Sequence, residues 1–298
     1  MRTFADMITL MKGASEKKTV VVAGADDDHT LEGLHSTMKA GLIKAVLIGN
    51  RDKINEIIKN QGYEIDAPII NVDDEQKAAE KAVFLIREGK GDFLMKGKLQ
   101  TATLLKEVVN KDNGLNIGSV MSHVGLLEIP NYHKLVAITD GGMVLYPDLA
   151  QKKSIVENAV RAVNGIGIDT PKVAVMAGAE VVNPKAIESV DADALKKMYL
   201  AGEIKDCIVE GPISYDLAMS GEAAEIKGYT SPVAGDTDIM IMPNMAAGNL
   251  VAKSLTVSGN TKMAGIIMGA KVPIVLVSRS ASSEEKFLSL LFAAAVSR

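Results

Sequence analysis

Short apolar runs rich in β-branched residues alternate with longer segments of helical periodicity along this chain. In its first part, strands are expected at 19–23, 45–48, 69–72 and 92–95, and helices at 29–40, 52–59, 73–87 and 101–110. Because these strands are apolar throughout rather than alternating, both faces of their sheet must be covered by helices. The alternation therefore predicts an α/β fold with mainly parallel sheets.

The rest of the chain continues this alternation with different spacing. Further strands are expected at 135–138, 172–176, 206–209, 238–242 and 273–277, and helices at 149–163, 184–200, 246–255 and 283–296. A length of 298 residues exceeds a typical single core and suits two domains. Because no linker rich in Pro, Gly or Ser divides the chain, we expect the final strand and helix to return to the first sheet.

Composition excludes several classes of protein. The net charge of -4 gives no basic footprint for nucleic acid. The single cysteine, Cys207, excludes an intrachain disulfide and indicates a reducing compartment. The apolar stretch 266–277 is interrupted by Lys271 and Pro273 and falls short of the ~20 residues that span a bilayer. Since the N-terminus also lacks a signal-peptide pattern, we expect a cytoplasmic protein with no nucleic-acid or membrane partner.

Polar residues follow the strand expected at 92–95, and ligands of parallel sheets bind beyond the carboxyl ends of strands. Lys96 and Lys98 come first, and Gln100 and Thr101 begin the next expected helix. Lysines, a hydroxyl and a helix N-terminus together suit an anion. A solvated turn explains the same residues equally well.

The segment after the first strand is acidic instead. Asp26, Asp27 and Asp28 would repel a pyrophosphate, so we interpret them as the N-cap of the helix that follows. Gly165 and Gly167 lack the third glycine of a dinucleotide-binding fingerprint and precede a strand rather than follow one. No nicotinamide site is therefore indicated.

Three further segments hold small or polar residues. Pro212 is expected to open a strand-to-helix turn in which Ser214 caps the helix, and small residues fill 231–235 and 243–249. Such residues let the backbone approach a ligand closely. Tight packing of a helix on a strand is the alternative.

The last strand ends in Ser278 and Arg279, and Glu284 and Glu285 begin the following helix. A hydroxyl, a permanent cation and a carboxylate therefore meet at one strand end. That combination suits a reaction that develops negative charge and needs a base. The alternative is a capped helix start, with Ser282 or Ser283 as the cap.

Signatures of other catalytic sites are missing from the sequence. The four histidines show no metal-ligand spacing, and neither a GxSxG elbow nor a P-loop occurs. The residues by themselves therefore indicate an anion-binding α/β enzyme with no metal site.

At these motifs the chain resembles the phosphate acetyl/butyryltransferases over nearly its whole length. The motifs that carry the resemblance lie at 211–216, 231–235, 243–249 and 277–279. Those at 95–97, 122–123, 138–140 and 146–152 are more similar to the butyryl branch, as is the chain's short length.

The resemblance implies a fold similar to the isocitrate and isopropylmalate dehydrogenases, with the active site in an interdomain cleft. Domain I would comprise residues 1–117 and 266–298, and domain II residues 118–265. The implied reaction converts acyl-CoA and phosphate to acyl phosphate and CoA in a ternary complex. CoA is a substrate, no cofactor or catalytic metal is needed, and a homo-oligomer is expected.

Residue roles also follow from the resemblance. Ser278 and Arg279 match the catalytic Ser-Arg pair, and Glu285 stands where the family carries a catalytic Asp. The expected substrate- and CoA-binding residues are Lys96, Thr101, Lys106, Asp216, Gly235 and Asn249. Lys106 replaces an Arg of acetyl-type members, and a point charge cannot grip an anion in the bidentate way of Arg.

Two alternative functions stay open at this point. One is a metal- and NAD-dependent dehydrogenase of the similar fold, which would need a cluster of aspartates that the sequence does not show convincingly. The other is a non-catalytic sensor of CoA or acyl phosphate.

Overall fold

The computed structural model describes residues 1–277 and 281–297. The chain forms two compact units. The middle unit comprises Met1–Thr3 and Val120–Met263, and the terminal unit comprises Phe4–Ser119 and Ala264–Arg298.

The sheet of the terminal unit has the strand order β3-β2-β1-β4-β11-β10. Its strands are β1 (Lys18–Ala23), β2 (Ile43–Gly49), β3 (Ile69–Asn71), β4 (Phe93–Lys96), β10 (Lys262–Met268) and β11 (Ile274–Val275). Neighbouring strands in this order pair in parallel, except that β10 runs antiparallel to β11. The final strand, β11, pairs with β4 and so returns to the first sheet, as the sequence predicts.

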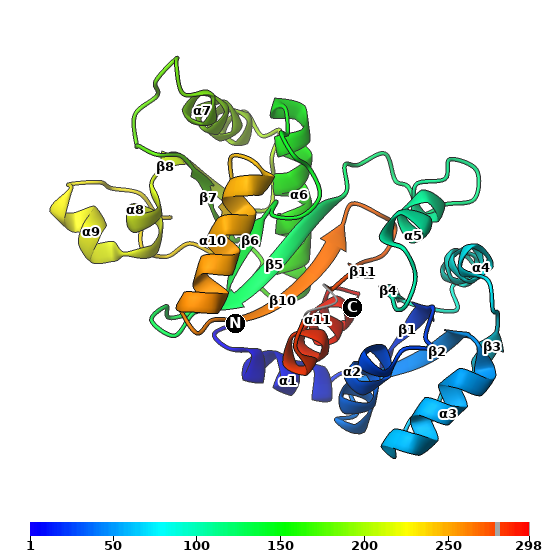
Figure 1. Ribbon diagram of the computed structural model, residues 1–298. Helices are drawn as coiled ribbons and strands as arrows, with labels where there is room; N and C mark the ends of the chain where they lie inside the picture. Colours follow the sequence, from blue (N-terminus) through cyan, green and yellow to red (C-terminus); the bar gives the residue numbers. More distant parts are fainter. Residues whose placement is uncertain (278–280, 298) are drawn as a thin grey trace. The chain divides into compact units, whose positions relative to one another are not determined.

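Six helices belong to the described part of the terminal unit. They are α1 (Phe4–Lys12), α2 (Asp28–Lys39), α3 (Arg51–Gln61), α4 (Glu75–Arg87), α5 (Thr101–Val108) and α11 (Ser283–Val296). The last helix packs against α2 and α1 (Figure 1). The contact is close because α2 offers Gly33, where an added Cβ would lie 3.1 Å from the Cβ of Lys286. Since α11 is buried from Leu288 to Ala295, it forms part of this unit's core.

The sheet of the middle unit has the order β5-β6-β9-β7-β8. Its strands are β5 (Ser122–Glu128), β6 (Val136–Thr139), β7 (Lys172–Met176), β8 (Ile208–Ile213) and β9 (Ile239–Ile241), and its helices are α6 (Leu149–Gly165), α7 (Ile187–Leu200), α8 (Tyr215–Met219), α9 (Gly221–Ile226) and α10 (Met245–Ser258). β6, β9, β7 and β8 pair in parallel, whereas β5 runs antiparallel to β6.

The expectation of an α/β fold with mainly parallel sheets is confirmed, with two corrections to the sequence analysis. β5 and β10 were not expected, and both run antiparallel to a neighbour. Pro212 lies inside β8 after a cis peptide bond rather than opening a turn, so that expectation is wrong. A proline can occupy β8 because this strand lies at the end of the strand order, where one edge needs no backbone N–H.

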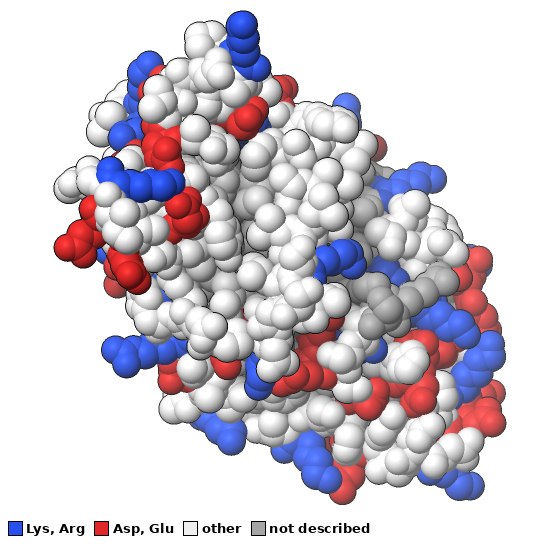
Figure 2. Space-filling view, turned by 60° about the vertical axis from the view of Figure 1, so that its left-hand side comes forward, with Lys and Arg blue, Asp and Glu red and all other residues white. Residues whose placement is uncertain are grey.

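Charges of both signs are interspersed on the face shown in Figure 2. This mixture matches the near balance of 33 Lys and Arg against 37 Asp and Glu. In the part of the chain that the structure describes, no helix is long and apolar enough to cross a membrane.

Candidate active site

A cavity of about 550 Å³ lies at the carboxyl ends of the strands of the terminal unit. Its lining comprises Asp27, His29, Thr30, Glu75, Met95, Lys96, Gly97, Lys98, Leu99, Gln100 and Val277. The chain leaves β1 toward β2 and β3 on one side, and β4 lies on the other side of β1. The cavity therefore occupies the crevice at which the strand order reverses, where open α/β sheets bind their ligands.

Lys96 and Lys98 both line this crevice, and hydrogen bonds hold the ammonium group of Lys96 in place. Its Nζ donates to the carbonyl oxygens of Gly97 at 3.0 Å and Leu99 at 3.1 Å. These bonds wrap the turn after β4 around the ammonium group. An ammonium held beside a cavity at the end of β4 can bind an anionic part of a substrate.

The turn after β4 is pressed against the turn after β1. Gly97 N donates to Ala23 O at 2.8 Å, and Lys98 N donates to Gly24 O at 2.7 Å. A Cβ on Gly97 would lie 2.1 Å from Gly24 O, so only glycine permits this approach. The two turns that line the cavity thus form one rigid wall.

The opposite part of the lining comes from the N-terminus of α2. Asp27 caps this helix, because its Oδ2 accepts from Thr30 N at 2.9 Å and from Thr30 Oγ1 at 2.7 Å. The interpretation of the acidic segment as an N-cap is therefore confirmed. His29 is exposed beside it and lines the cavity.

Thr101 and Lys106 both lie on α5. Gln100, which lines the cavity, immediately precedes Thr101, and its backbone N–H donates to Glu75 Oε2 at 3.2 Å. Thr101 is the first, exposed residue of the helix. Lys106 is exposed in the last turn, and it is not among the described residues that line the cavity.

Ser278 and Arg279 lie outside the described residues. Val277, the last described residue before them, lines the cavity. Glu285 lies in the first turn of α11, which Ser282 caps by accepting from Glu285 N at 3.1 Å. Of the two capping serines considered from the sequence, Ser282 is the cap.

The remaining three expected binding residues belong to the middle unit. Asp216 is on the first turn of α8, where it accepts from Ser214 Oγ at 2.6 Å and pairs with Lys227 Nζ at 2.9 Å. These hydrogen bonds from Ser214 and Lys227 hold the pKa of Asp216 at about 2. Asp216 is therefore an anion at neutral pH, and it can accept hydrogen bonds from hydroxyl or amide groups of a ligand.

Asn249 and Gly235 have structural partners that the sequence does not reveal. Asn249 Nδ2 donates to Gly141 O at 3.1 Å, which ties α10 to the turn after β6. Gly235 has a φ of 66°, and a Cβ there would lie 2.4 Å from Gly221 N. The close neighbour of Gly235 is thus the backbone at the start of α9 and not a strand.

The turn after β6 is itself organised by a buried carboxylate. Asp140 accepts from the backbone N–H groups of Gly142 at 2.7 Å, Met143 at 2.9 Å and Val144 at 3.0 Å. His123, on the neighbouring strand β5, has its pKa lowered by burial despite the nearby charge of Asp140. A neutral imidazole therefore lies at the carboxyl end of β6 at neutral pH.

Sequence reasoning placed Lys96 correctly at a strand end but missed Asp27, His29 and Glu75 as neighbours of the same cavity. These residues come together because of the order of the strands in the sheet, and no local sequence pattern reveals that order. One available signal was the alternation of strands and helices. Ligands of open α/β sheets bind where the strand order reverses, and this rule could have indicated that the turns after β1 and β4 lie side by side. Within the described residues, His, Cys, Asp and Glu side chains form no group of three or more that could hold a metal ion.

Comparison with known proteins gives concordant matches. Residues 74–294 match the family described as phosphate acetyl/butaryl transferase. Phosphate butyryltransferase of Clostridium acetobutylicum is 42% identical over 99% of this chain and 98% of its own length. Phosphate acetyltransferase of Thermotoga maritima is 40% identical over 97% of each chain.

A solved structure agrees with these sequence matches. The branched-chain phosphotransacylase from Enterococcus faecalis V583 has a TM-score of 0.82 and 35% sequence identity, and the match covers 94% of this chain and 99% of that one. The whole chain, and not a single motif, therefore carries the likeness. This chain belongs to the phosphate acetyl/butaryl transferase family.

Proposed function

We propose that this protein is a phosphate butyryltransferase, which converts acyl-CoA and inorganic phosphate to acyl phosphate and CoA. The observation that carries the proposal is the 42% identity to a phosphate butyryltransferase across 99% of the chain. The cavity at the switch point, with Lys96 fixed beside it, supports a substrate that carries phosphate groups.

The proposed chemistry is direct transfer in a ternary complex. A phosphate oxygen attacks the thioester carbonyl, the carbon–sulfur bond breaks, and the CoA thiolate leaves. In the reverse direction Glu285 takes the thiol proton, the thiolate attacks the carbonyl of the acyl phosphate, the carbon–oxygen bond breaks, and phosphate leaves. A free thiol has a pKa of ~8.5, so only a few per cent is thiolate at neutral pH and a base assists.

Ser278 and Arg279 are proposed to stabilise the charge that develops in this reaction. Arg279 would neutralise the phosphate and the carbonyl oxygen, and Ser278 would donate to the developing oxyanion. Removing one such donor typically costs ~2.7–4 kcal/mol of transition-state stabilisation. Their support is the family match together with Val277, which lines the cavity one residue earlier.

Six residues are proposed to bind CoA. Lys96, Thr101 and Lys106 would meet anionic groups, whereas Asp216, Gly235 and Asn249 would contact hydroxyl or amide groups. We propose that CoA is a substrate and that no cofactor or metal takes part. A dehydrogenase-like fold with an interdomain cleft, a homo-oligomer and a cytoplasmic location are further predictions that follow from the family resemblance.

The preferred acyl group is proposed to have four carbons, straight or branched. Each buried methylene contributes ~0.8 kcal/mol, so the preference for butyryl-CoA over acetyl-CoA should be graded rather than absolute. We expect a higher kcat/KM for butyryl-CoA. A higher value for acetyl-CoA would place the chain in the acetyl branch, to which a 40% identical relative belongs.

One assay tests the function against its two alternatives. Purified protein is mixed with butyryl-CoA and phosphate, without added metal or NAD, and released thiol is measured together with butyryl phosphate. Thiol release that depends on phosphate supports the proposal. Activity that appears only with NAD and a divalent cation on a hydroxy-acid substrate would indicate a dehydrogenase, and CoA binding without turnover would indicate a sensor.

A further inference from the structure

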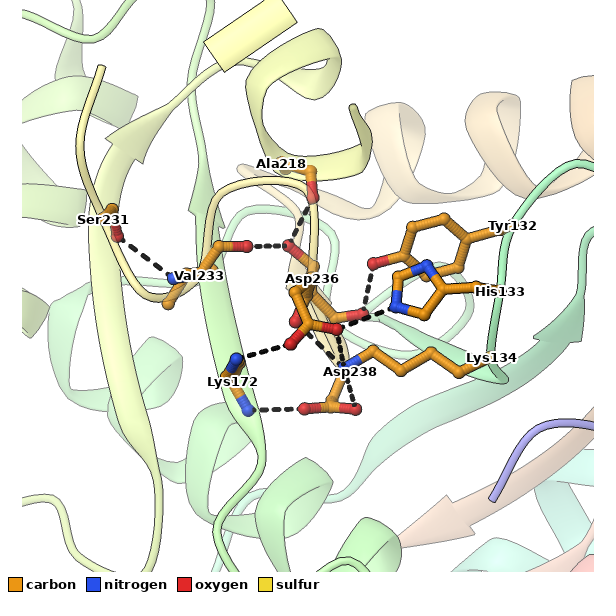
Figure 3. A network of polar contacts seen from close by, with 10 residues as sticks. Tyr132, His133, Lys134, Lys172, Ala218, Ser231, Val233, Asp236 and Asp238 are labelled. Atoms are coloured by element: carbon orange, nitrogen blue, oxygen red, sulfur yellow. Dashed lines mark hydrogen bonds and ion pairs between the residues drawn. The ribbon is translucent and has the colours of Figure 1, made fainter. Parts of the chain in front are cut away.

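Asp236 lies at the centre of an ion-pair cluster in the middle unit (Figure 3). Its Oδ1 is 2.8 Å from His133 Nε2 and 2.7 Å from Lys134 Nζ, and its Oδ2 accepts from Lys172 Nζ. His133 and Lys134 precede β6, whereas Lys172 is the first residue of β7. One carboxylate thus joins the beginnings of two strands to the segment before β9.

The next two residues reinforce the same connection. Asp238 is buried, pairs with Lys134 Nζ at 2.7 Å and accepts from Lys172 N at 2.8 Å. The carbonyl oxygen of Thr237 accepts from Tyr132 Oη at 2.8 Å. Segment 236–238 is therefore fixed to the sheet by both side-chain and backbone contacts.

The loop of residues 231–237, which includes part of this segment, also contacts the short helix α8. Gly235 N donates to Leu217 O at 2.9 Å, and Thr237 Oγ1 donates to Ala218 O at 2.8 Å. An α8 of five residues cannot satisfy these carbonyl groups by its own i→i+4 bonds, because it ends before their partners. Val233 is fully buried in one cluster with Leu217, so packing adds to the hydrogen bonds.

Asp216 is the second residue of this helix, directly before Leu217. A chain of contacts therefore runs from the cations around Asp236 through the 231–237 loop to α8 and Asp216. This series of contacts therefore connects Gly235 and Asp216, the two residues of this region that the family resemblance assigns to substrate binding.

The electrostatics of the cluster keep Asp236 charged. Desolvation raises the pKa of Asp236, but hydrogen bonds from Lys134, Lys172 and His133 outweigh it and hold the pKa well below the usual range. The other titratable groups facing the cluster are Asp238 and Tyr132, and burial raises the pKa of Tyr132 above its usual value. Asp236 is therefore an anion at every pH at which the enzyme would be assayed.

We propose that Asp236 is a positioning residue for substrate binding, which fixes the 231–237 loop and through it the place of Gly235 and Asp216. The role in substrate binding rests on the proposed function, whereas the fixing of the loop and α8 does not. A purely stabilising ion pair would lower the unfolding temperature without changing substrate affinity. The positioning role predicts a change in affinity in protein that stays folded.

Asp236→Asn removes the charge at constant shape, and Asp92→Asn is a matched control. Asp92 also pairs with a lysine, Lys18, and accepts a backbone N–H from Thr19. Its side chain is 35% exposed, against 39% for Asp236. Asp92 precedes β4 in the terminal unit, at the amino end of the strands and opposite the cavity.

The first measurement is hydrogen exchange of the protein without substrate. In Asp236→Asn we expect at least ~10-fold faster exchange at the amides of residues 215–220 and 231–237, since local opening follows the free energy of the lost contacts. Asp92→Asn should leave these amides unchanged. Equal exchange in Asp236→Asn and the parent protein would overturn the proposal even if the enzyme proves inactive.

The second measurement is a double-mutant cycle on KM. We expect Asp236→Asn to raise KM for butyryl-CoA about 10-fold with kcat within about 3-fold, and Asp236→Glu to recover most of the loss. In an Asp216→Ala background, Asp236→Asn should raise KM much less, because the two substitutions act on the same interaction between Asp216 and the substrate. An undiminished effect in that background would overturn the route through Asp216.

Two outcomes separate this proposal from the proposed function. If the parent protein transfers no acyl group, or if Asp216→Ala leaves KM unchanged, the assigned substrate site is wrong, and hydrogen exchange alone decides whether Asp236 fixes the loop. If Asp236→Asn does not fold, Lys172→Met is used instead, because it removes one partner of Asp236. It should change hydrogen exchange and KM in the same directions but by smaller factors.

Discussion

Glu284 and Glu285 are neighbours in sequence but differ in exposure at the start of α11. Glu284 is exposed, whereas Glu285 is half-buried and its backbone N–H is held by Ser282. Adjacent helical residues point about 100° apart, so only one of the two can face the interior of the unit. Glu285 is the less exposed of the two.

We expect Glu285→Gln to lower kcat by ~10²–10⁴ in the direction that consumes the CoA thiol, which is the usual contribution of a general base. Raising the pH toward ~8.5 should partly restore the rate, because thiolate then forms without a base. The measurement is kcat against pH with butyryl phosphate and CoA.

Glu284→Gln serves as the control for this substitution, since it changes the same charge one residue away. It should alter kcat little. If Glu284→Gln is the impaired variant, the assignment by family spacing is wrong, and if neither is impaired, the thiol proton passes to another group.

Cys207 is a buried thiol, 5% exposed, and burial raises its pKa to about 11. A pKa of about 11, against ~8.5 for a free thiol, leaves at least ~100-fold less thiolate at a given pH. We therefore expect a thiol reagent at pH 8 to react with Cys207 at least ~100-fold more slowly in the folded protein than in denaturant. Rapid labelling of the folded protein would show that β8 opens locally, since Cys207 directly precedes this strand.

At the scale of elements, the junction of the turns after β1 and β4 is the least tolerant part of the candidate site. A methyl group at Gly97 would lie 2.1 Å from Gly24 O, whereas one at exposed Gly178 would meet nothing within 4 Å. We expect Gly97→Ala to cost about 1–3 kcal/mol of unfolding free energy and to raise KM. Gly178→Ala should be neutral or slightly stabilising in the same urea titration. Equal stabilities would mean that the two turns can separate freely.

The alternation of elements was readable because most strands are continuous apolar runs between helices of regular period. β7 and α11 have the expected bounds, 172–176 and 283–296. β5 and β10 were missed for a physical reason: Gly125 and Gly265 interrupt their apolar patterns, and glycine is depleted in strands. α8 and α9 span five and six residues, too short for a helical period to show.

The candidate site was predictable only where its residues follow one strand in sequence. Lys96 follows from the pattern at the end of β4, but Glu75 and His29 join it through strand order and helix packing. Asp236 lies far from Lys134 and Lys172 in the sequence, so no local sequence pattern reveals its contacts with them. Long-range ion pairs of this kind become visible only once the strands are in place.

For the molecule as a whole, the main feature is that the terminal unit is assembled from both ends of the chain. β11 and α11 complete a sheet and core begun by β1, β2 and β4. We expect deletion of residues 283–298 to expose the amides of β1 and β4 to hydrogen exchange while those of β7 and β8 stay protected. Deletion of residues 297–298 alone should change neither. Unchanged protection of β1 in the longer deletion would show that α11 is dispensable for this core.

This arrangement also sets an order of events while the protein is being made. A ribosome adds roughly 5–20 residues per second, and domains tend to fold as they emerge. Residues 4–119 leave the ribosome before the middle unit, yet their sheet and core wait for β10, β11 and α11, which follow that unit in the sequence. Residues 120–263 emerge in between as one continuous segment and can complete their own core first. Residues 4–119 are therefore made before the middle unit but completed after it, and until then the apolar faces of their strands stay partly uncovered.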